Sequence, residues 1–375
     1  MINVRGFSPP YEGLFCENSA TMELPFTMIA EGEVDSMQHM EREITEHVML
    51  CDAKGQLNPD AIGFARQPLV ISNLRGNFMR KKKWNYWCVF GEEVMFSATI
   101  CHLDYSTVCF VYFLNYETQR FYEKTVIMPF TRQIKLSNQV LDTSHFRHEE
   151  MNIKFEYEHN ETRILVAVEE FDGEPLEASL LIRHPENHES LNVVIPWNRQ
   201  TFQFTGKHLS LPATGSVTLG NRTYKMDPGD SFAVLDYGRG IWPRESSWNW
   251  GMASQRSDGK TIGLNFGGKW TDGTGMTENA FFVDGKMTKL HEDVLFHYNS
   301  ENYKEPWFIQ TKFSDDVKLT FTPFFERESK TDLKLVKSEI HQLIGYYNGY
   351  VRYPDGRKLK ISQILGAVEE HFAKW

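Results

Sequence analysis

The sequence has little excess positive charge and no long hydrophobic run. Its 375 residues carry 40 lysines and arginines against 50 aspartates and glutamates, giving a formal net charge of -10 and a pI near 5.8. A general nucleic-acid binder needs a basic face to displace counterions from phosphates, so we expect no nucleic-acid partner. No segment approaches the roughly 18 apolar residues of a membrane-spanning helix, and we expect no integral membrane segment.

Cysteine is scarce, and its five copies form no CxxC pair. Cys88, Cys101 and Cys109 stand in apolar runs typical of strands; the other two are Cys16 and Cys51. An odd number without pairing motifs indicates free thiols in a reducing compartment. The N-terminal residues also lack the basic-then-apolar order of a secretory signal peptide. These features together predict a cytoplasmic protein.

Motifs of several enzyme classes are missing. The sequence contains no GxSxG elbow, no Walker loop and no Rossmann fingerprint. His145 with His148, and His184 with His188 and Glu189, have spacings that a metal could use. Both groups lie in strongly polar stretches, and neither matches a zinc signature such as HExxH. We therefore predict neither a metal site nor a cofactor.

Aromatic residues and short alternating runs are abundant. The 27 phenylalanines, 15 tyrosines and 9 tryptophans can bury enough surface to offset the entropy lost on ordering. Runs of β-branched and aromatic residues alternate with period two between Gly, Asn, Asp and Pro, which predicts an all-β fold. Four DG pairs are hairpin signals: Asp172-Gly173, Asp258-Gly259, Asp284-Gly285 and Asp355-Gly356.

Two segments favour helical structure. Asn58-Pro59-Asp60 can open a short helical turn, because asparagine caps such turns. The last segment, Lys360–Trp375, predicts a C-terminal amphipathic helix from its apolar spacing. The residues at that spacing are Ile361, Ile364, Leu365, Val368 and Phe372.

An internal repeat indicates duplication. The pattern R-G-x-aromatic-x-R-x-x-x-W-N-aromatic begins at Arg75 and again at Arg239, an offset of 164 positions (239 minus 75). A period this long predicts two copies of one domain rather than a solenoid. We expect an arm over residues 1–38, a first β domain over 39–200 and a second over 201–375. Each can form an antiparallel barrel with a cavity for a small ligand.

The same segments resemble the bacterial family of unknown function DUF2804, from about Ile44 to Trp375. The segments that carry the resemblance are Trp84–Trp87, Leu235–Pro243, Trp248–Gly251, Gly267–Gly275 and Thr277–Asn279. More distantly, a Trp-Gly turn followed by a DG hairpin resembles the AttH and carotenoid 1,2-hydratase group. This resemblance implies two calycin-like or lipocalin-like barrels in tandem. In that group an acidic residue precedes the Trp-Gly turn, whereas Ser246 and Ser247 stand here, which weakens transfer of a hydratase mechanism.

The second copy carries most of the candidate site. Carboxyl, amide and cationic residues alternate there with tryptophans, which is the profile of a small-molecule pocket. Asp272 and Glu278 are the predicted acid or base, since a carboxyl against indole rings has a raised pKa. Lys269 could stabilise a developing negative charge. The predicted ligand-binding residues of this copy are Trp242, Glu245, Trp248, Asn249, Trp250, Trp270 and Asn279.

Other candidates have a competing structural interpretation. Arg239 and Asp236 could form an ion pair that holds the fold together, with the tryptophans as core. Because the R-G block is duplicated, Arg75, Trp84, Asp236 and Arg239 are predicted to be structural. In the first copy, three residues at a strand end could face the ligand: His102, Asp104 and Tyr105.

Two function classes follow from this composition. The first is a cofactor-independent acid–base enzyme (hydratase, lyase, isomerase or cyclase) acting on a largely apolar molecule such as an isoprenoid or acyl lipid. The second is a non-catalytic lipid or isoprenoid carrier. Tryptophan-lined walls with carboxyl groups also suit sugar rings, so a carbohydrate ligand stays open for either class.

Overall fold

Strands, nearly all of them in antiparallel sheets, make up most of the described chain. The computed structural model describes residues 40–130, 133–332 and 337–375, and His39–Trp375 form one compact unit. The all-β prediction is confirmed. Within the described ranges, no helix has the length and apolar character needed to cross a lipid bilayer. The predicted arm, residues 1–38, and Cys16 lie outside the described residues.

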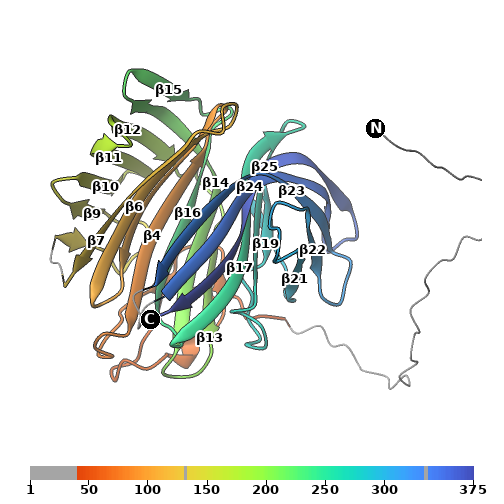
Figure 1. Cartoon of the computed structure of the whole chain (residues 1–375). Coiled ribbons are helices and arrows are strands. Elements are labelled where there is room, and N and C mark those ends of the chain that lie inside the picture. The colour runs from red at the N-terminus through yellow and green to blue at the C-terminus, as the bar shows by residue number, and fades with distance from the viewer. Residues whose placement is uncertain (1–39, 131–132, 333–336) are drawn as a thin grey trace, which may run out of the picture. The chain divides into compact units, whose positions relative to one another are not determined.

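The first sheet has the strand order β7-β6-β5-β4-β16-β14-β12-β11-β10-β9-β8, with β2, β13 and β15 paired at its side (Figure 1). A separate parallel pair joins β1 (Val48–Met49) and β3 (Val70–Ile71). The strands of the first sheet are β2 (Phe64–Ala65), β4 (Lys81–Phe90), β5 (Val94–His102), β6 (Ser106–Asn115), β7 (Phe121–Pro129), β8 (Ile134–Lys135), β9 (Ser144–Arg147), β10 (Met151–Glu158), β11 (Glu161–Phe171), β12 (Glu174–Arg183), β13 (Leu191–Pro196), β14 (Phe202–Leu219), β15 (Arg222–Met226) and β16 (Phe232–Ile241).

The second sheet has the order β20-β19-β18-β17-β25-β24-β23-β22-β21. Its strands are β17 (Glu245–Ser257), β18 (Lys260–Gly268), β19 (Ala280–Val283), β20 (Lys286–Lys289), β21 (Val294–His297), β22 (Trp307–Thr311), β23 (Val317–Asp332), β24 (Lys337–Arg352) and β25 (Lys358–Lys374).

The two sheets share one topology. In each, the first long strand starts a meander of four strands and also pairs antiparallel with the last strand: β4 with β16, and β17 with β25. These curled antiparallel half-barrel sheets match the predicted pair of lipocalin-like domains (Figure 1). The chain changes sheet between Ile241 and Glu245, whereas the boundary predicted near residue 200 falls between β13 and β14. The division into 39–200 and 201–375 stays a prediction.

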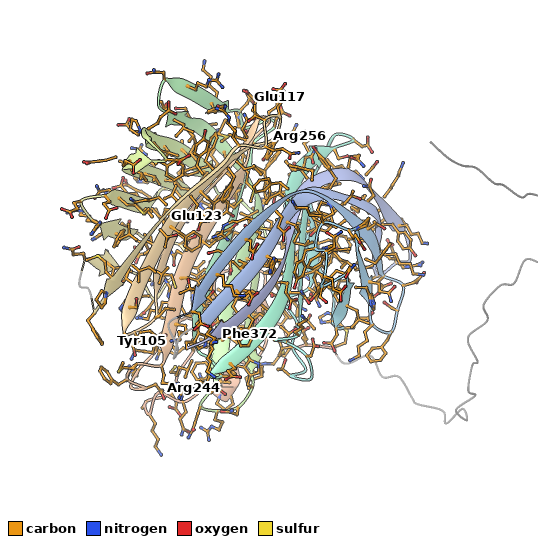
Figure 2. The ribbon with its side chains drawn as sticks, viewed as in Figure 1. Tyr105, Glu117, Glu123, Arg244, Arg256 and Phe372 are labelled. Carbon is orange, nitrogen blue, oxygen red and sulfur yellow. The ribbon has the colours of Figure 1, made fainter. Side chains whose placement is uncertain are left out.

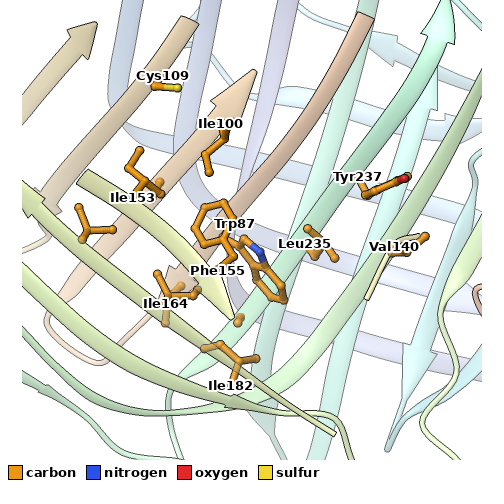
Figure 3. Close-up of a cluster of buried hydrophobic side chains, with 14 of the residues drawn as sticks. Trp87, Ile100, Cys109, Val140, Ile153, Phe155, Ile164, Ile182, Leu235 and Tyr237 are labelled. Carbon is orange, nitrogen blue, oxygen red and sulfur yellow. The ribbon is translucent and has the colours of Figure 1, made fainter. Parts of the chain in front are cut away.

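Each sheet encloses its own apolar core. Alternation along β4 puts Trp87 and Val89 inside the first sheet, while Tyr86 and Cys88 face the opposite side. Figure 3 shows Trp87 surrounded by apolar side chains from the curled strands. One further cluster fills the inside of the second sheet, and another lies between the sheets. Two-sided burial of this kind follows from packing two layers face to face.

The predicted C-terminal helix is wrong, because Lys358–Lys374 is strand β25. Both faces of this strand are buried: Ile364 and Val368 enter the core of the second sheet, while Leu365 faces the first. An irregular residue, Gln363, has a positive φ of 53° and shifts the alternation between Ile361 and Ile364. A strand buried on both faces with a bulge produces apolar residues at helix-like spacing.

The turn predictions are confirmed. All four DG pairs connect adjacent antiparallel strands, and each glycine has a positive φ, as tight hairpin turns require. The asparagine cap also forms: Asn58 Oδ1 accepts from the Asp60 backbone N–H at 3.1 Å, and a 3-10 turn follows over Pro59–Ala61. Cys51, Cys88 and Cys109 are buried free thiols, and Cys101 is half-buried.

Candidate functional site

A cavity of about 190 Å³ lies between the two sheets. Every second side chain along several strands faces this cavity. These positions are 84 and 86, 203, 205 and 207, 248 and 250, and 369 and 371. The lining residues are Trp84, Tyr86, Thr99, Cys101, Phe110, Gln203, Thr205, Lys207, Asp236, Trp242, Trp248, Trp250, Trp270, Glu278, Arg327, Ile340, Gln342, Glu369, His371 and Trp375. The expected cavity inside one barrel is thus found between two half-barrels, because each sheet fills its own interior with apolar side chains.

Six of the nine tryptophans line this cavity. Trp242 lies at their centre, with ring centroids 5.3 Å from Trp270, 5.4 Å from Trp248 and 5.9 Å from Trp84. Every one of the six indole N–H groups donates to an acceptor within the protein. The tryptophans therefore present their ring faces to a ligand and keep their donors for the protein.

One end of the polar lining is an ion cluster around Lys207. Its Nζ lies 3.0 Å from Asp236 Oδ1 and 3.1 Å from Glu278 Oε2, with all three side chains largely buried. Burial alone would lower the pKa of Lys207, but the two carboxyl groups outweigh it and raise that pKa. Lys207 also lies 4.1 Å over the Trp250 ring. The cation is therefore held firmly in its charged form.

A different carboxyl, Glu369, forms no ion pair with a lysine or arginine of the described residues. Its Oε1 accepts from Trp248 Nε1 at 2.8 Å and its Oε2 from Gln342 Nε2 at 3.2 Å. Burial raises the pKa of Glu369 to about 7, against the opposing effects of the Trp248 hydrogen bond and the charges of Arg327 and Lys207. This carboxyl group can therefore hold or release a proton near neutral pH.

The neighbours of Glu369 leave it unpaired. His371 Nδ1 lies 4.0 Å away, but burial lowers the pKa of His371 to about 3, so the imidazole is neutral. Arg327 is engaged with Glu123, at 2.9 Å through Nε and 2.7 Å through Nη2. Glu123 belongs to β7 of the first sheet and is labelled in Figure 2, so this pair joins the two sheets.

Several residues predicted from the sequence come together here. Glu278 lines the cavity, accepts from Trp270 Nε1 at 2.8 Å and has its pKa raised by burial. The tryptophans predicted to bind ligand, at positions 242, 248, 250 and 270, line it too. Trp84 and Asp236, predicted to be structural, are also part of its wall, with Trp84 Nε1 donating to Asp236 Oδ2 at 3.1 Å.

Other predicted residues lie elsewhere in the second half. Lys269 and Asn249 contact Glu370 on the opposite face of β25, with Lys269 Nζ 2.6 Å and Asn249 Nδ2 2.7 Å from Glu370 Oε2. Asp272 is exposed and accepts from the backbone N–H of Lys269 at 3.0 Å. Glu245 is exposed and pairs with Lys374 at 2.5 Å.

Asn279 is buried, but it serves the backbone. Its Oδ1 accepts from the Gly267 N–H at 2.8 Å, and its Nδ2 donates to the Glu292 carbonyl at 2.9 Å. These bonds fix the connection between β18 and β19, the segment that carries Trp270 and Glu278 into the cavity. Asn279 is thus one layer behind the lining.

In the first half, the strand-end group forms a separate cluster. Asp104 pairs with Lys81 at 3.0 Å, and His102 Nδ1 accepts from the Asp104 backbone N–H at 3.2 Å. Tyr105, labelled in Figure 2, packs under Lys82, whose Nζ lies 4.5 Å from its ring centroid and 5.2 Å from that of Trp375. This cluster touches the cavity through Trp375.

The duplicated arginines differ. Arg239 is fully buried and donates to the Trp84 carbonyl at 2.7 Å and to Asn85 Oδ1 at 2.8 Å. It binds these oxygens in place of the expected partner Asp236, which pairs with Lys207. Arg75 is exposed in the loop before β4. The part of the repeat that is structurally equivalent is therefore W-N-aromatic, at the start of β4 and β17.

The sequence analysis did not identify four titratable residues of the lining and the amide that bonds one of them. These residues are Lys207, Arg327, Glu369, His371 and Gln342. Glu369 and His371 were hidden in the segment interpreted as a helix. Their signal was the alternation Leu365, Ala367, Glu369, His371, in which polar groups continue an apolar face.

Comparison of the fold with solved structures finds seven matching chains, among them two distant neighbours. An AttH protein of Nitrosomonas europaea aligns with 80% of this chain and 94% of its own, at 11% identity and a TM-score of 0.42. Kievitone hydratase of Nectria haematococca aligns with 80% of this chain and 90% of its own, at 12% identity and a TM-score of 0.42.

Comparison of the sequence with curated proteins finds no match. The family of domains of unknown function DUF2804 matches residues 41–375, which hold both sheets and the cavity between them. The chain therefore belongs to the DUF2804 family.

Proposed function

We propose that this protein is an acid–base enzyme that acts on an apolar small molecule held between the two sheets. The reactions that suit the site are hydration, elimination of water and isomerisation. Each needs a proton placed on one atom of the substrate and another removed nearby, with no group beyond the protein's own side chains. The proposed proton donor is Glu369.

The observation that carries this proposal is the state of Glu369. It faces the cavity and its pKa is raised to about 7, mainly by burial. A carboxyl group in an aromatic cavity is poised to act as an acid when its pKa lies near the working pH. A site that served storage alone would gain nothing from an enclosed carboxyl of this kind, since a buried polar group costs stability.

The lining favours an apolar ligand over a sugar. The six indole N–H groups and the oxygens of Asp236, Glu278 and Glu369 all face a protein partner. A sugar needs a partner for every buried hydroxyl, and a desolvated hydroxyl without one costs about 1–3 kcal/mol. Among the described residues, the Thr99 hydroxyl and the Gln203 Nε2 amide group have no hydrogen-bond partner, and they could form hydrogen bonds with one polar substituent.

Turnover in a metabolite extract tests the proposal even though the substrate is unidentified. The protein is incubated with extract of its own host in D₂O or in water labelled with ¹⁸O, and new labelled masses are detected by mass spectrometry. We expect an apolar compound to gain label with the wild-type protein. Glu369→Gln should lower that rate by about 100-fold or more, the range for loss of a general acid.

The adjacent residue offers a matched control. Glu370 belongs to the same strand but faces the opposite side, so Glu370→Gln should keep wild-type turnover. Full turnover by Glu369→Gln would exclude Glu369 as the acid. The same assay examines the acids predicted from the sequence: full turnover in Glu278→Gln or in Asp272→Asn removes that residue from the mechanism.

A further inference from the structure

The duplication produces two equivalent carboxyl positions in the cavity. Asp236 on β16 is the register partner of Tyr86 on β4, two residues after Trp84. Glu369 on β25 is the register partner of Trp250 on β17, two residues after Trp248. The two acids therefore occupy the same place in the two copies of the topology.

Their hydrogen bonds repeat the equivalence. Trp84 Nε1 donates to Asp236 Oδ2 at 3.1 Å, and Trp248 Nε1 donates to Glu369 Oε1 at 2.8 Å. Each acid thus accepts from the tryptophan of its own W-N-aromatic motif. Both acids line the one cavity.

The residue on the other neighbouring strand breaks this symmetry. Asp236 pairs in register with Lys207 on β14, and their charged atoms lie 3.0 Å apart. Glu369 pairs in register with Gln342 on β24, whose Nε2 donates to it at 3.2 Å. Tyr112 donates to Gln342 Oε1 at 3.0 Å, which turns the amide NH₂ toward Glu369. A lysine therefore faces one acid and a neutral amide the other.

We propose that Asp236 is the second catalytic group of the cavity, acting as a base opposite the acid Glu369, and that Lys207 and Gln342 are positioning residues that give the two carboxyl groups different charge surroundings. This inference rests on the proposed function. It attributes the different charge surroundings of Asp236 and Glu369 to one residue difference between the copies, Lys207 in one and Gln342 in the other.

The charges around each acid support this division. Asp236 accepts from Thr205, Trp84 and Lys207, three donors that stabilise a carboxylate. Glu369 faces Arg327 of β23, Lys207 of β14, Asp236 of β16 and the neutral His371 of its own strand. Arg327 and Lys207 lower the pKa of Glu369, whereas the Asp236 charge raises it and burial prevails. The two acids are thus close enough to influence each other.

Elimination of water illustrates the chemistry. The Glu369 carboxyl proton moves to the substrate hydroxyl, the C–O bond breaks and water leaves. The Asp236 carboxylate takes a proton from the adjacent carbon, and the C–H electron pair becomes the new C=C bond. The protein ends with Glu369 ionised and Asp236 protonated, so one proton returns between them before the next turnover. Hydration is the same sequence in reverse.

Infrared titration of the substrate-free protein tests the positioning roles. The C=O band of a protonated carboxyl, seen in wild type but missing in Glu369→Gln, follows Glu369 as the pH changes. We expect its midpoint near 7 in wild type. In Gln342→Lys a cation beside Glu369 should lower the midpoint by about one unit or more. The matched neutral variant Gln342→Met should keep it at or above the wild-type value.

The reciprocal change is made on the other copy. Lys207→Gln should create a protonated carboxyl band that Lys207→Gln combined with Asp236→Asn lacks. An unchanged Glu369 midpoint in Gln342→Lys, or no Asp236 band in Lys207→Gln, would overturn the positioning roles. If Gln342→Lys does not fold, the Lys207→Gln pair of spectra decides alone.

Turnover separates this inference from the proposed function. Loss of turnover in both Glu369→Gln and Asp236→Asn supports the acid–base pair. Loss in Glu369→Gln with full turnover in Asp236→Asn keeps the proposed function and rejects Asp236 as the base. Full turnover in both rejects the two together. If Asp236→Asn is unstable, it is combined with Lys207→Met and Glu278→Gln, which removes all three charges of the cluster, and this variant is compared with Glu278→Gln.

Discussion

Three carboxyl groups line the cavity, and their different neighbours give them different expected roles. Asp236 and Glu278 share the ammonium group of Lys207, at 3.0 and 3.1 Å, while Glu369 has a tryptophan and a glutamine as its hydrogen-bond donors. All three are enclosed by aromatic rings. Ion pairing favours the charged form and burial favours the neutral form. Burial prevails at Glu278 in spite of Lys207, and at Glu369, where the donors are neutral, it raises the pKa to about 7.

The raised pKa of Glu369 predicts that the free energy of unfolding decreases as the pH rises from 4.5 to 7. The folded protein holds this proton up to about pH 7, whereas the unfolded chain releases it near 4.5. The contribution of the neutral carboxyl to stability is therefore complete below pH 4.5 and is lost as the pH rises to 7. Relative to wild type, Glu369→Gln should gain about 3 kcal/mol of unfolding free energy between pH 4.5 and 8.

Urea unfolding at several pH values measures that gain. Glu370→Gln, whose side chain is half-buried and paired with Lys269, serves as the control and should show no comparable pH-dependent gain. A constant difference between Glu369→Gln and wild type across this range would mean that Glu369 is ionised in the folded protein.

Removal of the central cation should be costly. Lys207→Met leaves Asp236 and Glu278 buried without their counter-charge, and loss of one partner of a buried pair typically costs about 3–5 kcal/mol. The exposed Lys286, 3.4 Å from Glu189, is the control, and Lys286→Met should change stability by less than about 1 kcal/mol. Chemical denaturation of both variants gives the comparison. Equal stability of the two would show that the Lys207 cluster adds nothing to folding.

At the scale of elements, alternation and turns could be predicted well, and one strand could not. The DG hairpins follow from local backbone preferences, which is why all four are present. The segment Lys358–Lys374 failed because its burial on two faces is a property of the assembled sheets. The spacing of its apolar residues alone does not distinguish such a strand from a buried helix.

The fit between β4 and β16 depends on a glycine. Gly238 is the register partner of Trp84, and a Cβ atom at Gly238 would lie 2.0 Å from the Trp84 ring. Gly238→Ala should therefore displace Trp84 from the cavity wall, lower stability by about 1–3 kcal/mol and change the tryptophan fluorescence. Gly229→Ala, whose nearest neighbour is Asp227 Oδ1 at 3.1 Å, is the control. Wild-type fluorescence and stability in Gly238→Ala would contradict this packing.

At the scale of the whole described unit, the site belongs to the contact between the sheets. The duplication predicted two related β structures, and the W-N-aromatic motif predicted where each contributes tryptophans. The pairing of Lys207 with Asp236 and Glu278 could not be predicted, because these residues meet through strand register and through contact between the sheets. Spacing along the chain carries no information about either.

One buried and two half-buried histidines predict how the described unit loses stability in acid. Burial lowers the pKa of His184 to about 4 and that of His371 to about 3, and it lowers the pKa of His208 as well. Because the unfolded value is near 6.5, their contribution to stability is complete above pH 6.5 and is lost as the pH falls toward 4. Thermal unfolding should show a melting temperature that decreases over this window.

One variant isolates this effect. His184→Gln can keep a hydrogen bond to Thr162 Oγ1, which His184 Nε2 contacts at 2.8 Å, but it cannot take up a proton. The decrease in melting temperature between pH 6.5 and 4 should be smaller in His184→Gln than in wild type. His159→Gln changes an exposed histidine and should follow the wild-type curve. Parallel curves for all three proteins would show that His184 is not a source of the acid sensitivity.

The central claim is that an apolar molecule reacts in the space between the two sheets. A crystal structure of the Glu369→Gln variant with the compound that the labelling assay identifies tests this most directly. We predict that the compound lies against the faces of Trp84, Trp242 and Trp248, with its reacting atom within hydrogen-bond distance of position 369. A compound bound inside the core of one sheet, or on its outer face, would contradict the account.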